Sequence, residues 1–162
     1  LVLDTSAASV DDATVWNDTA PTSSVFSIGT HTDVNTNTET YVAYVFTSVE
    51  GFSKFGPYTG NNNADGTFIY CGFKPRFLIA KKIASGNWML SDTARNTYNP
   101  AATLLFPSTT DADTTGTDYI DFVSNGFKLR HTGGLNAAVD YIFTAFAENP
   151  FGGDGVAPVT AR

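Results

Sequence analysis

The pattern closest to a metal site in this chain is a short acidic turn. Asp111, Asp113 and Gly116 stand at the first, third and sixth positions of a calcium-binding loop, where oxygen ligands alternate and glycine permits a sharp turn. The twelfth position, which needs a glutamate to close the coordination shell, holds Phe122. Residues 61–66 repeat the opening of this pattern more weakly and also lack the glutamate. Asp and Asn at these spacings are typical of tight turns. We therefore expect turns, with calcium at Asp111 and Asp113 as the alternative.

Acid–base catalysis has little support in the residue pattern. The chain contains three glutamates: Glu39, Glu50 and Glu148. A glycosidase needs two carboxyl groups about 5–9 Å apart across one cleft, and a pair such as Asp92 with Asp121 stays open at this point. His31 and His131 have no nucleophile motif beside them. We expect that the protein is not an enzyme and needs no cofactor.

Recognition of a sugar or protein surface needs an exposed aromatic ring with planar polar groups beside it. Trp16 lies among Asp, Asn and Thr residues, so we expect its indole to be accessible, whereas alternation around Trp88 predicts burial in the core. Residues 95–100 form a loop whose Arg, Asn and Tyr side chains can stack and hydrogen-bond. The candidate contact residues are Trp16, Arg95, Asn96, Tyr98 and Asn99. A surface turn that binds nothing is the alternative.

The composition excludes several classes of partner. The chain is 42% hydrophobic and 14% aromatic, but only 15% charged, which favours sheet over helix. A net charge of −7 argues against nucleic acid, whose phosphates require clustered Lys and Arg. No apolar run is long enough to span a bilayer. Cys71 is the single cysteine and has apolar neighbours, so we expect a buried, unreactive thiol. Lys81 and Lys82 fall on opposite faces of a strand and are expected to keep a sheet edge soluble.

Apolar runs separated by Gly, Pro, Asn and Asp recur along the chain and predict an all-β fold. The predicted strands lie at residues 25–28, 41–47, 68–73, 77–83, 87–91, 103–106, 119–123, 127–130 and 141–147. Asn125 and Gly126 between two such runs predict a hairpin with a type I′ turn. One short helix is expected within residues 11–18, ended by Pro21. The architecture indicated is an antiparallel β-sandwich, jelly-roll-like, rather than a barrel.

Part of the chain resembles another part of itself. The aligned segments are residues 25–28 with 126–129, 34–35 with 135–136, and 41–46 with 141–146. The offset of roughly 100 residues is the length of a small β domain. We therefore expect residues 1–50 to be the second half of a preceding β repeat, 51–151 a complete sandwich repeat, and 152–162 a Gly- and Pro-rich tail.

A half repeat exposes unpaired strand edges. We therefore expect residues 1–50 to pair with the following unit, with another subunit, or with sequence upstream. On this interpretation the chain is the C-terminal portion of a longer polypeptide.

Several short sequence segments occur in a set order, at residues 55–61, 72–81, 86–92, 124–129 and 141–151. Together they resemble the C-terminal repeat region of tail-fibre-like virion structural proteins of bacteriophages, particularly phages of marine bacteria. In such proteins these repeats often stand beside concanavalin-like, laminin-G-type sandwich modules. The resemblance covers nearly the whole chain and carries no motif of binding residues.

The resemblance implies a β-rich module of a phage appendage that assembles in the host cytoplasm and acts on the virion. It implies a homo-oligomer, a trimer by family analogy, with other virion proteins and a host-surface glycan or protein as partners. Two alternatives stay open: a carbohydrate-binding or adhesin module of a bacterial surface protein, and a capsid decoration or head-fibre protein. We expect no binding to nucleic acid and no insertion into a membrane.

Overall fold

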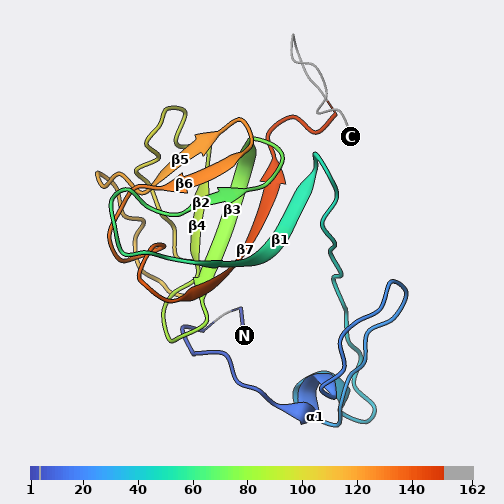
Figure 1. Ribbon diagram of the computed structural model, residues 1–162. Helices are drawn as coiled ribbons and strands as arrows, with labels where there is room; N and C mark the ends of the chain where they lie inside the picture. Colours follow the sequence, from blue (N-terminus) through green and yellow to red (C-terminus); the bar gives the residue numbers. More distant parts are fainter. Residues whose placement is uncertain (4, 152–162) are drawn as a thin grey trace. The chain divides into compact units, whose positions relative to one another are not determined.

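The computed structural model describes residues 1–3 and 5–151, so the predicted tail at 152–162 lies outside the described residues. The chain divides into two compact units. One unit consists of Leu1–Ser9 and Thr47–Arg162, and the other consists of Val10–Phe46. Every strand of the described chain belongs to the first unit, whereas the second holds two short helices (Figure 1).

Two antiparallel sheets form the first unit, which confirms the predicted all-β sandwich. The four-stranded sheet has the order β1 (Ser53–Thr59), β7 (Asp140–Ala147), β3 (Pro75–Lys82) and β4 (Met89–Asp92). The three-stranded sheet has the order β2 (Phe68–Tyr70), β6 (Gly126–Leu129) and β5 (Ile120–Val123). Figure 1 shows the three-stranded sheet in front of the four-stranded one.

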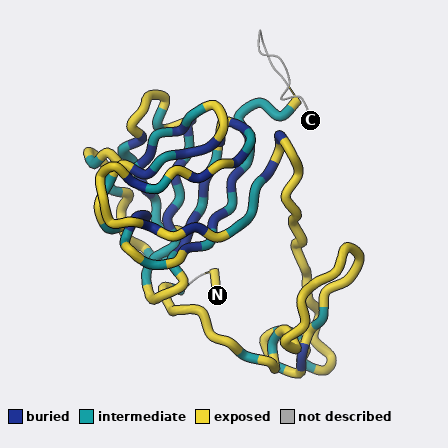
Figure 2. The backbone as a smooth tube through the Cα atoms, viewed as in Figure 1, coloured by how far each residue is buried: buried dark blue, intermediate teal, exposed yellow. Residues whose placement is uncertain are grey.

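Alternating residues of the strands build the core between the sheets, as the sequence pattern predicts. In β7 the inward residues Tyr141, Phe143 and Ala145 are buried, and they alternate with half-buried residues. The rings of Phe127 in β6 and Phe143 meet edge to face with centroids 5.5 Å apart, and Tyr58 in β1 stacks on Tyr141 at 4.8 Å. Figure 2 shows this alternation as dark segments along each strand, whereas residues 10–46 are mostly exposed.

Two predicted strands, at residues 25–28 and 41–47, are wrong because neither segment forms a strand. They align with residues 126–129 and 141–146, which do form β6 and β7. A strand obtains its backbone hydrogen bonds from its neighbours, and β7 has two, β1 and β3. Within the unit Val10–Phe46 no strand stands beside residues 41–46. The structure therefore does not show the sequence repeat as a repeated fold.

Other differences from the predicted elements have local causes. β1 was missed because Gly56 and Pro57 stand inside it, and proline is tolerated on an edge strand, whose outward N–H groups need no partner. The strand predicted at 103–106 is reduced to isolated bridges at Leu104 and Leu105. The predicted helix is present as α1 (Ala13–Trp16) and ends well before Pro21. A second helical turn, α2 (Thr32–Asn35), was not predicted.

The hairpin between β5 and β6 is confirmed, but its predicted turn type is wrong. Val123 pairs with Gly126, so the turn consists of Ser124 and Asn125, and neither residue has the positive φ that a type I′ turn requires. Gly126 serves a different purpose there. A Cβ atom at Gly126 would lie 2.1 Å from the carbonyl oxygen of Ile69, so only glycine lets β2 approach β6 this closely.

The expected positions of Lys81 and Trp88 are also wrong. Lys81 is fully buried on β3, an interior strand, and its Nζ lies 3.3 and 3.4 Å from the carbonyl oxygens of Lys82 and Ala84. Burial and the nearby Lys82 charge lower the pKa of Lys81. Trp88 is half-buried, and its Nε1 donates to the Val2 carbonyl at 3.0 Å, while Met89 takes the core position. The alternation was therefore assigned one residue out of phase at Trp88.

Candidate functional site

The loop after β4 is organised by the carboxylate of Asp92. Its Oδ1 accepts the backbone N–H groups of Ala94 and Arg95 at 3.0 and 2.9 Å. Its Oδ2 accepts from the guanidinium of Arg95, at 2.8 Å from Nε and at close range from Nη2. Burial alone would raise the pKa of Asp92, but the bonds to Arg95 and its positive charge hold that pKa below its ordinary value. One edge of the Arg95 guanidinium is therefore committed to the fold.

Asn96 is engaged inside the same loop. Its Oδ1 accepts the N–H groups of Ala102 and Thr103 at 3.0 and 3.1 Å. Its Nδ2 reaches the Ser91 hydroxyl and the carbonyl of Thr103 at 3.5 and 3.4 Å. The amide that was expected to contact a ligand thus joins the two ends of the loop.

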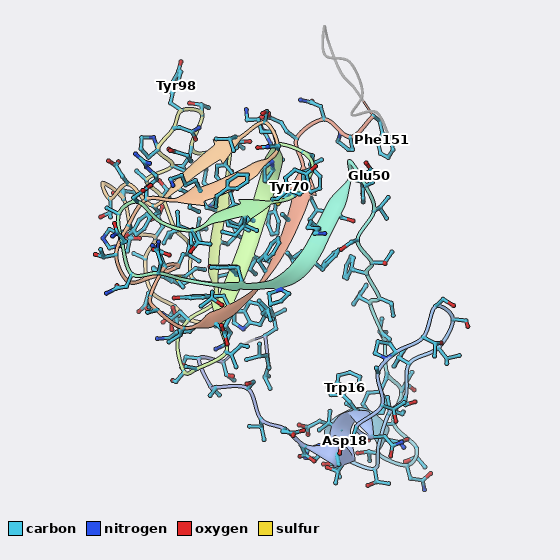
Figure 3. The ribbon with its side chains drawn as sticks, in the orientation of Figure 1. Trp16, Asp18, Glu50, Tyr70, Tyr98 and Phe151 are labelled. Atoms are coloured by element: carbon cyan, nitrogen blue, oxygen red, sulfur yellow. The ribbon has the colours of Figure 1, made fainter. Side chains whose placement is uncertain are left out.

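Asn99 takes the place of a neighbouring strand. Its Oδ1 accepts the N–H of Phe122 at 2.9 Å and its Nδ2 donates to the carbonyl of the same residue at 2.8 Å. This two-point contact covers the outer edge of β5. Tyr98 is 86% exposed and stands at the tip of the loop, pointing away from the sandwich (Figure 3). Of the loop residues predicted to make contacts, Arg95, Tyr98 and Asn99 are exposed, although the Asn99 amide is bonded to β5, and Asn96 is half-buried.

Trp16 belongs to the other unit, so it forms a separate candidate surface. It is 55% exposed at the end of α1 (Figure 3), which agrees with the accessibility expected from its polar neighbours. Its ring meets Phe26 edge to face at 6.4 Å. Together with residues 41–46, Trp16 and Phe26 line an apolar cavity of about 570 Å³ within the unit.

Asp111 and Asp113 lie in an exposed turn. The Asp111 carboxylate accepts from the Thr109 hydroxyl at 2.9 Å, and that hydroxyl accepts the Asp111 N–H at 3.2 Å. Gly116 has a φ of 85°, as a tight turn requires. Across residues 1–3 and 5–151, no group of three or more His, Cys, Asp or Glu side chains lies close enough to hold a metal ion. The geometry supports the turn, and calcium stays an untested alternative.

The weaker calcium-like segment, residues 61–66, is a turn bound to a buried asparagine. Asn61 Oδ1 accepts the N–H of Asn63 at 3.0 Å, and Asn63 Oδ1 accepts the N–H of Asp65 at 2.9 Å. Asn136, only 1% exposed, accepts from Asn61 N at 3.0 Å. Its Nδ2 lies 2.9 Å from Asn61 Oδ1, 2.8 Å from Asn63 O and 3.0 Å from His131 O. The oxygens that resemble calcium ligands are therefore used within the fold.

The carboxylate pair considered for glycoside hydrolysis does not share a cleft. Asp92 lies on the outer face of the four-stranded sheet and Asp121 on the outer face of the three-stranded sheet, where Arg130 Nε stands 3.3 Å from it. The core separates the two groups. Among residues 1–3 and 5–151, no Ser, Thr or Cys side chain is hydrogen-bonded to either histidine. The Nδ1 of His31 instead caps α2 by accepting the Asp33 N–H at 3.1 Å.

Two exposed aromatic residues on β2 were not identified from the sequence. Phe68 and Tyr70 are 45% and 64% exposed, and they alternate with the buried residues Ile69 and Cys71 (Figure 3 labels Tyr70). The signal was present in the alternation, because residues two apart on a strand share one face. Once Ile69 and Cys71 are assigned to the core, Phe68 and Tyr70 must face outward.

Phe68 and Tyr70 belong to the outer face of the three-stranded sheet, which we call the β2 face. The strand register defines two rows across it: Phe68, Lys128, Asp121 and Tyr70, Gly126, Val123. Because Gly126 has no side chain, β6 places no side chain directly beside Tyr70.

The charges on the β2 face are balanced. Lys128 Nζ lies 2.6 Å from an Asp65 carboxylate oxygen, and Arg130 Nε lies 3.3 Å from Asp121 Oδ2. The hydrogen bond and positive charge of Lys128 lower the pKa of Asp65. Two basic and two acidic groups therefore cancel on this face, although the chain as a whole carries −7. The β2 face therefore presents aromatic side chains on a surface whose electrostatic potential is not dominated by charges of one sign.

These features define an antiparallel β-sandwich module that presents exposed aromatic side chains on a charge-balanced sheet face and on a loop. The chain belongs to the family described as Domain of unknown function (DUF7483), whose model matches residues 1–150. No curated protein and no solved structure matches the chain. None of the helices in the described residues has the length and apolar character needed to cross a membrane.

Proposed function

We propose that this protein is a non-enzymatic structural module of a bacteriophage virion, in the distal tail fibre or a related appendage, and that it contributes to attachment at the host surface. The sequence segments that occur in a set order along the chain support the virion assignment, because they resemble tail-fibre-like repeats. The observation that carries the attachment role is the combination of three covered sheet edges, at β1, β4 and β5, with accessible aromatic rings at Tyr70 and Tyr98.

The open edge of β1 is covered by its own flanking residues. Val49 pairs with Ser53, and the Ser48 hydroxyl both accepts the Phe55 N–H at 3.0 Å and lies 3.4 Å from its carbonyl oxygen. The next residue whose backbone nitrogen points to the open edge is Pro57, which has no N–H group. A partner strand therefore finds few backbone donors along this edge.

The edges of β4 and β5 are covered in a similar way. Leu90 in β4 exchanges two backbone hydrogen bonds of 2.9 Å with Leu105. At β5, Ala101 forms a β-bridge with Ile120, and the Asn99 side chain hydrogen-bonds both the N–H and the carbonyl of Phe122. Such protection suits a module that must stand beside many copies of itself in a particle without edge-to-edge aggregation. At these three edges, contact with other molecules is then left to side chains.

The accessible side chains favour an uncharged partner. Tyr70 and Phe68 offer ring faces on a charge-balanced surface, and Tyr98 offers a ring at a loop tip. Aromatic faces of this kind stack on sugar rings, and the phenol hydroxyl adds a hydrogen bond. Each contact is weak, but several copies in an oligomer add up through avidity. A neutral host-surface glycan is the ligand class that these features fit best.

Two experiments test the proposal. Antibodies against this protein should label the appendages of the phage that encodes it in immuno-electron microscopy. Label on the capsid would favour a decoration protein, and unlabelled particles would refute the virion role. In affinity electrophoresis through neutral polysaccharides, we expect retardation that weakens at least roughly tenfold in Tyr70→Ala. Binding without any virion label would favour an adhesin or carbohydrate-binding module.

A further inference from the structure

The connections before residues 41 and 141 share an unusual hydrogen-bond motif, although the segments that follow them differ in structure. The Tyr141 hydroxyl accepts the Ala137 N–H at 3.1 Å and donates to the Gly134 carbonyl at 2.6 Å. The Tyr41 hydroxyl accepts the Thr36 N–H at 2.9 Å and donates to the Thr32 carbonyl at 2.8 Å. In both places one phenol group closes the loop immediately upstream of it.

A second contact recurs in the same two connections. Asn136 Nδ2 donates to the carbonyl of His131 at 3.0 Å, and the aligned Asn35 donates through Nδ2 to the carbonyl of Gly29 at 2.8 Å. Each asparagine therefore binds a backbone carbonyl five or six residues earlier. The sequence alignment of residues 24–47 with 125–147 thus corresponds to shared side-chain bonding in the loops.

The aligned apolar residues differ sharply in burial. In the sandwich, Phe127, Leu129, Tyr141 and Ala145 are each 0% exposed. Their equivalents Phe26, Ile28, Tyr41 and Val45 are 45%, 43%, 46% and 73% exposed. All four of these equivalents line the 570 Å³ cavity of the second unit. Residues suited to two facing strands of a core therefore surround an unfilled apolar space.

The charges argue against a second copy of the same unit in that space. Residues 10–46 contain five Asp or Glu and no Lys or Arg. In the sandwich β6 and β7 are flanked by β1, β2, β3 and β5. Residues 53–82, which hold β1 to β3, contain five Lys or Arg and one Asp, whereas residues 51–123 as a whole contain six basic and six acidic residues. A second copy of the acidic unit would repel the first, whereas a segment like residues 51–123 is neutral overall and is basic in the part that holds β1 to β3.

We infer that residues 24–47 are the last two strands of a second sandwich, and that a segment of the same polypeptide equivalent to residues 51–123 completes it. In that sandwich residues 25–28 pair as β6 does, and residues 41–46 lie between equivalents of β1 and β3. The apolar cavity becomes the core between the two sheets. The inference concerns the folding of tandem repeats and does not depend on where the protein acts.

A tandem chimera tests this directly. Residues 51–123 are fused to Ser23, so that the chain reads 51–123 followed by 23–162. Hydrogen–deuterium exchange is then followed for the amides of residues 41–47 in the chimera and in the original chain. We expect at least roughly 100-fold slower exchange in the chimera, because paired strand amides open only with their sheet. Equal exchange rates in the two chains, with residues 140–147 protected in both, would overturn the inference.

Matched variants of the chimera separate core packing from mere proximity. Val45→Lys places a charge where the buried Ala145 stands in the sandwich and should abolish the protection. Tyr44→Thr installs the residue that β7 carries at Thr144, outside the core, and should retain it. Loss of protection in both variants, or in neither, contradicts the assigned register.

A second arm remains decisive if the chimera does not fold. In the original chain, residues 125–147 are replaced by residues 24–47, so that the segment must act as β6 and β7 in the existing sandwich. We expect cooperative urea unfolding, and no cooperative transition when residues 24–47 are scrambled. A replaced chain that behaves like the scrambled one refutes the inference. Protection of residues 41–47 in a concentration-dependent dimer of the original chain would instead assign the space to a second copy.

Discussion

Replacement of Asn136 should remove more stability than any other single polar substitution in the loop that it supports. The side chain is 1% exposed and connects residues 61–63 with His131 through one accepted and three donated contacts. Each such bond contributes about 0.5–1.5 kcal/mol net. Asn61 and Asn63 are exposed and regain water when the amide is removed, so we expect Asn136→Ala to cost about 3 kcal/mol rather than the full sum.

Urea unfolding followed by tryptophan fluorescence or circular dichroism measures this loss. With an m-value of about 2 kcal/mol/M, the midpoint should fall by about 1.5 M. Asn136→Asp keeps the shape but turns a carboxylate oxygen toward three acceptor oxygens, so it should be at least as destabilising. Asn125→Ala, in the exposed β5–β6 turn, is the matched control and should change stability by less than about 0.5 kcal/mol.

The reasoning fails if Asn136→Ala loses less than about 1 kcal/mol, or if Asn136→Asp unfolds at the wild-type midpoint. Either result would mean that the loop at residues 61–66 is held by its own turns and not by the buried amide.

Two further predictions concern titratable groups. Burial alone would raise the pKa of Glu148, but its ion pairs with Lys74 at 2.7 Å and Arg76 at 3.6 Å hold it below the ordinary value. The carboxylate therefore stabilises the fold at neutral pH, and this contribution is lost as pH falls through the folded-state pKa. Glu148→Gln should cost about 1 kcal/mol at pH 7 and progressively less in acid, as measured by urea unfolding, and a gap independent of pH would contradict this. Burial raises the pKa of the Cys71 thiol to about 12. A disulfide reagent at pH 8 should leave it unmodified in the native protein and modify it in urea, and rapid native labelling would contradict its buried position.

The local sequence pattern was sufficient to predict the structure wherever a residue's environment is determined by its neighbours in the sequence. Alternation identified residues 127–130 as a strand with one buried face, and Phe127 and Leu129 are indeed buried. Asn125 and Gly126 indicated the hairpin, and the polar setting of Trp16 indicated an exposed indole at the end of a short helix. In each case the physical cause acts within about four residues.

The bonding of the candidate site residues depends on long-range contacts, which the local sequence does not show. Asn99 was expected to face a ligand, but its partner is the backbone of Phe122 on another strand. Lys81 was assigned to an edge because nothing in the local sequence shows that β3 lies between β7 and β4. Tyr70 was not identified, although its alternation with the buried residues Ile69 and Cys71 places it on the outer face of β2.

Residues 41–46 show how far a strand depends on its neighbours. They resemble residues 141–146 in sequence and follow a loop closed by the same tyrosine motif, yet only the later segment forms a strand. The difference lies outside both segments: β7 has β1 and β3 on either side, and residues 41–46 have no neighbouring strand within their unit. Backbone hydrogen bonds and core burial are supplied by those neighbours. The sequence of residues 41–46 is therefore compatible with a strand, and the presence of β1- and β3-like partners decides whether one forms.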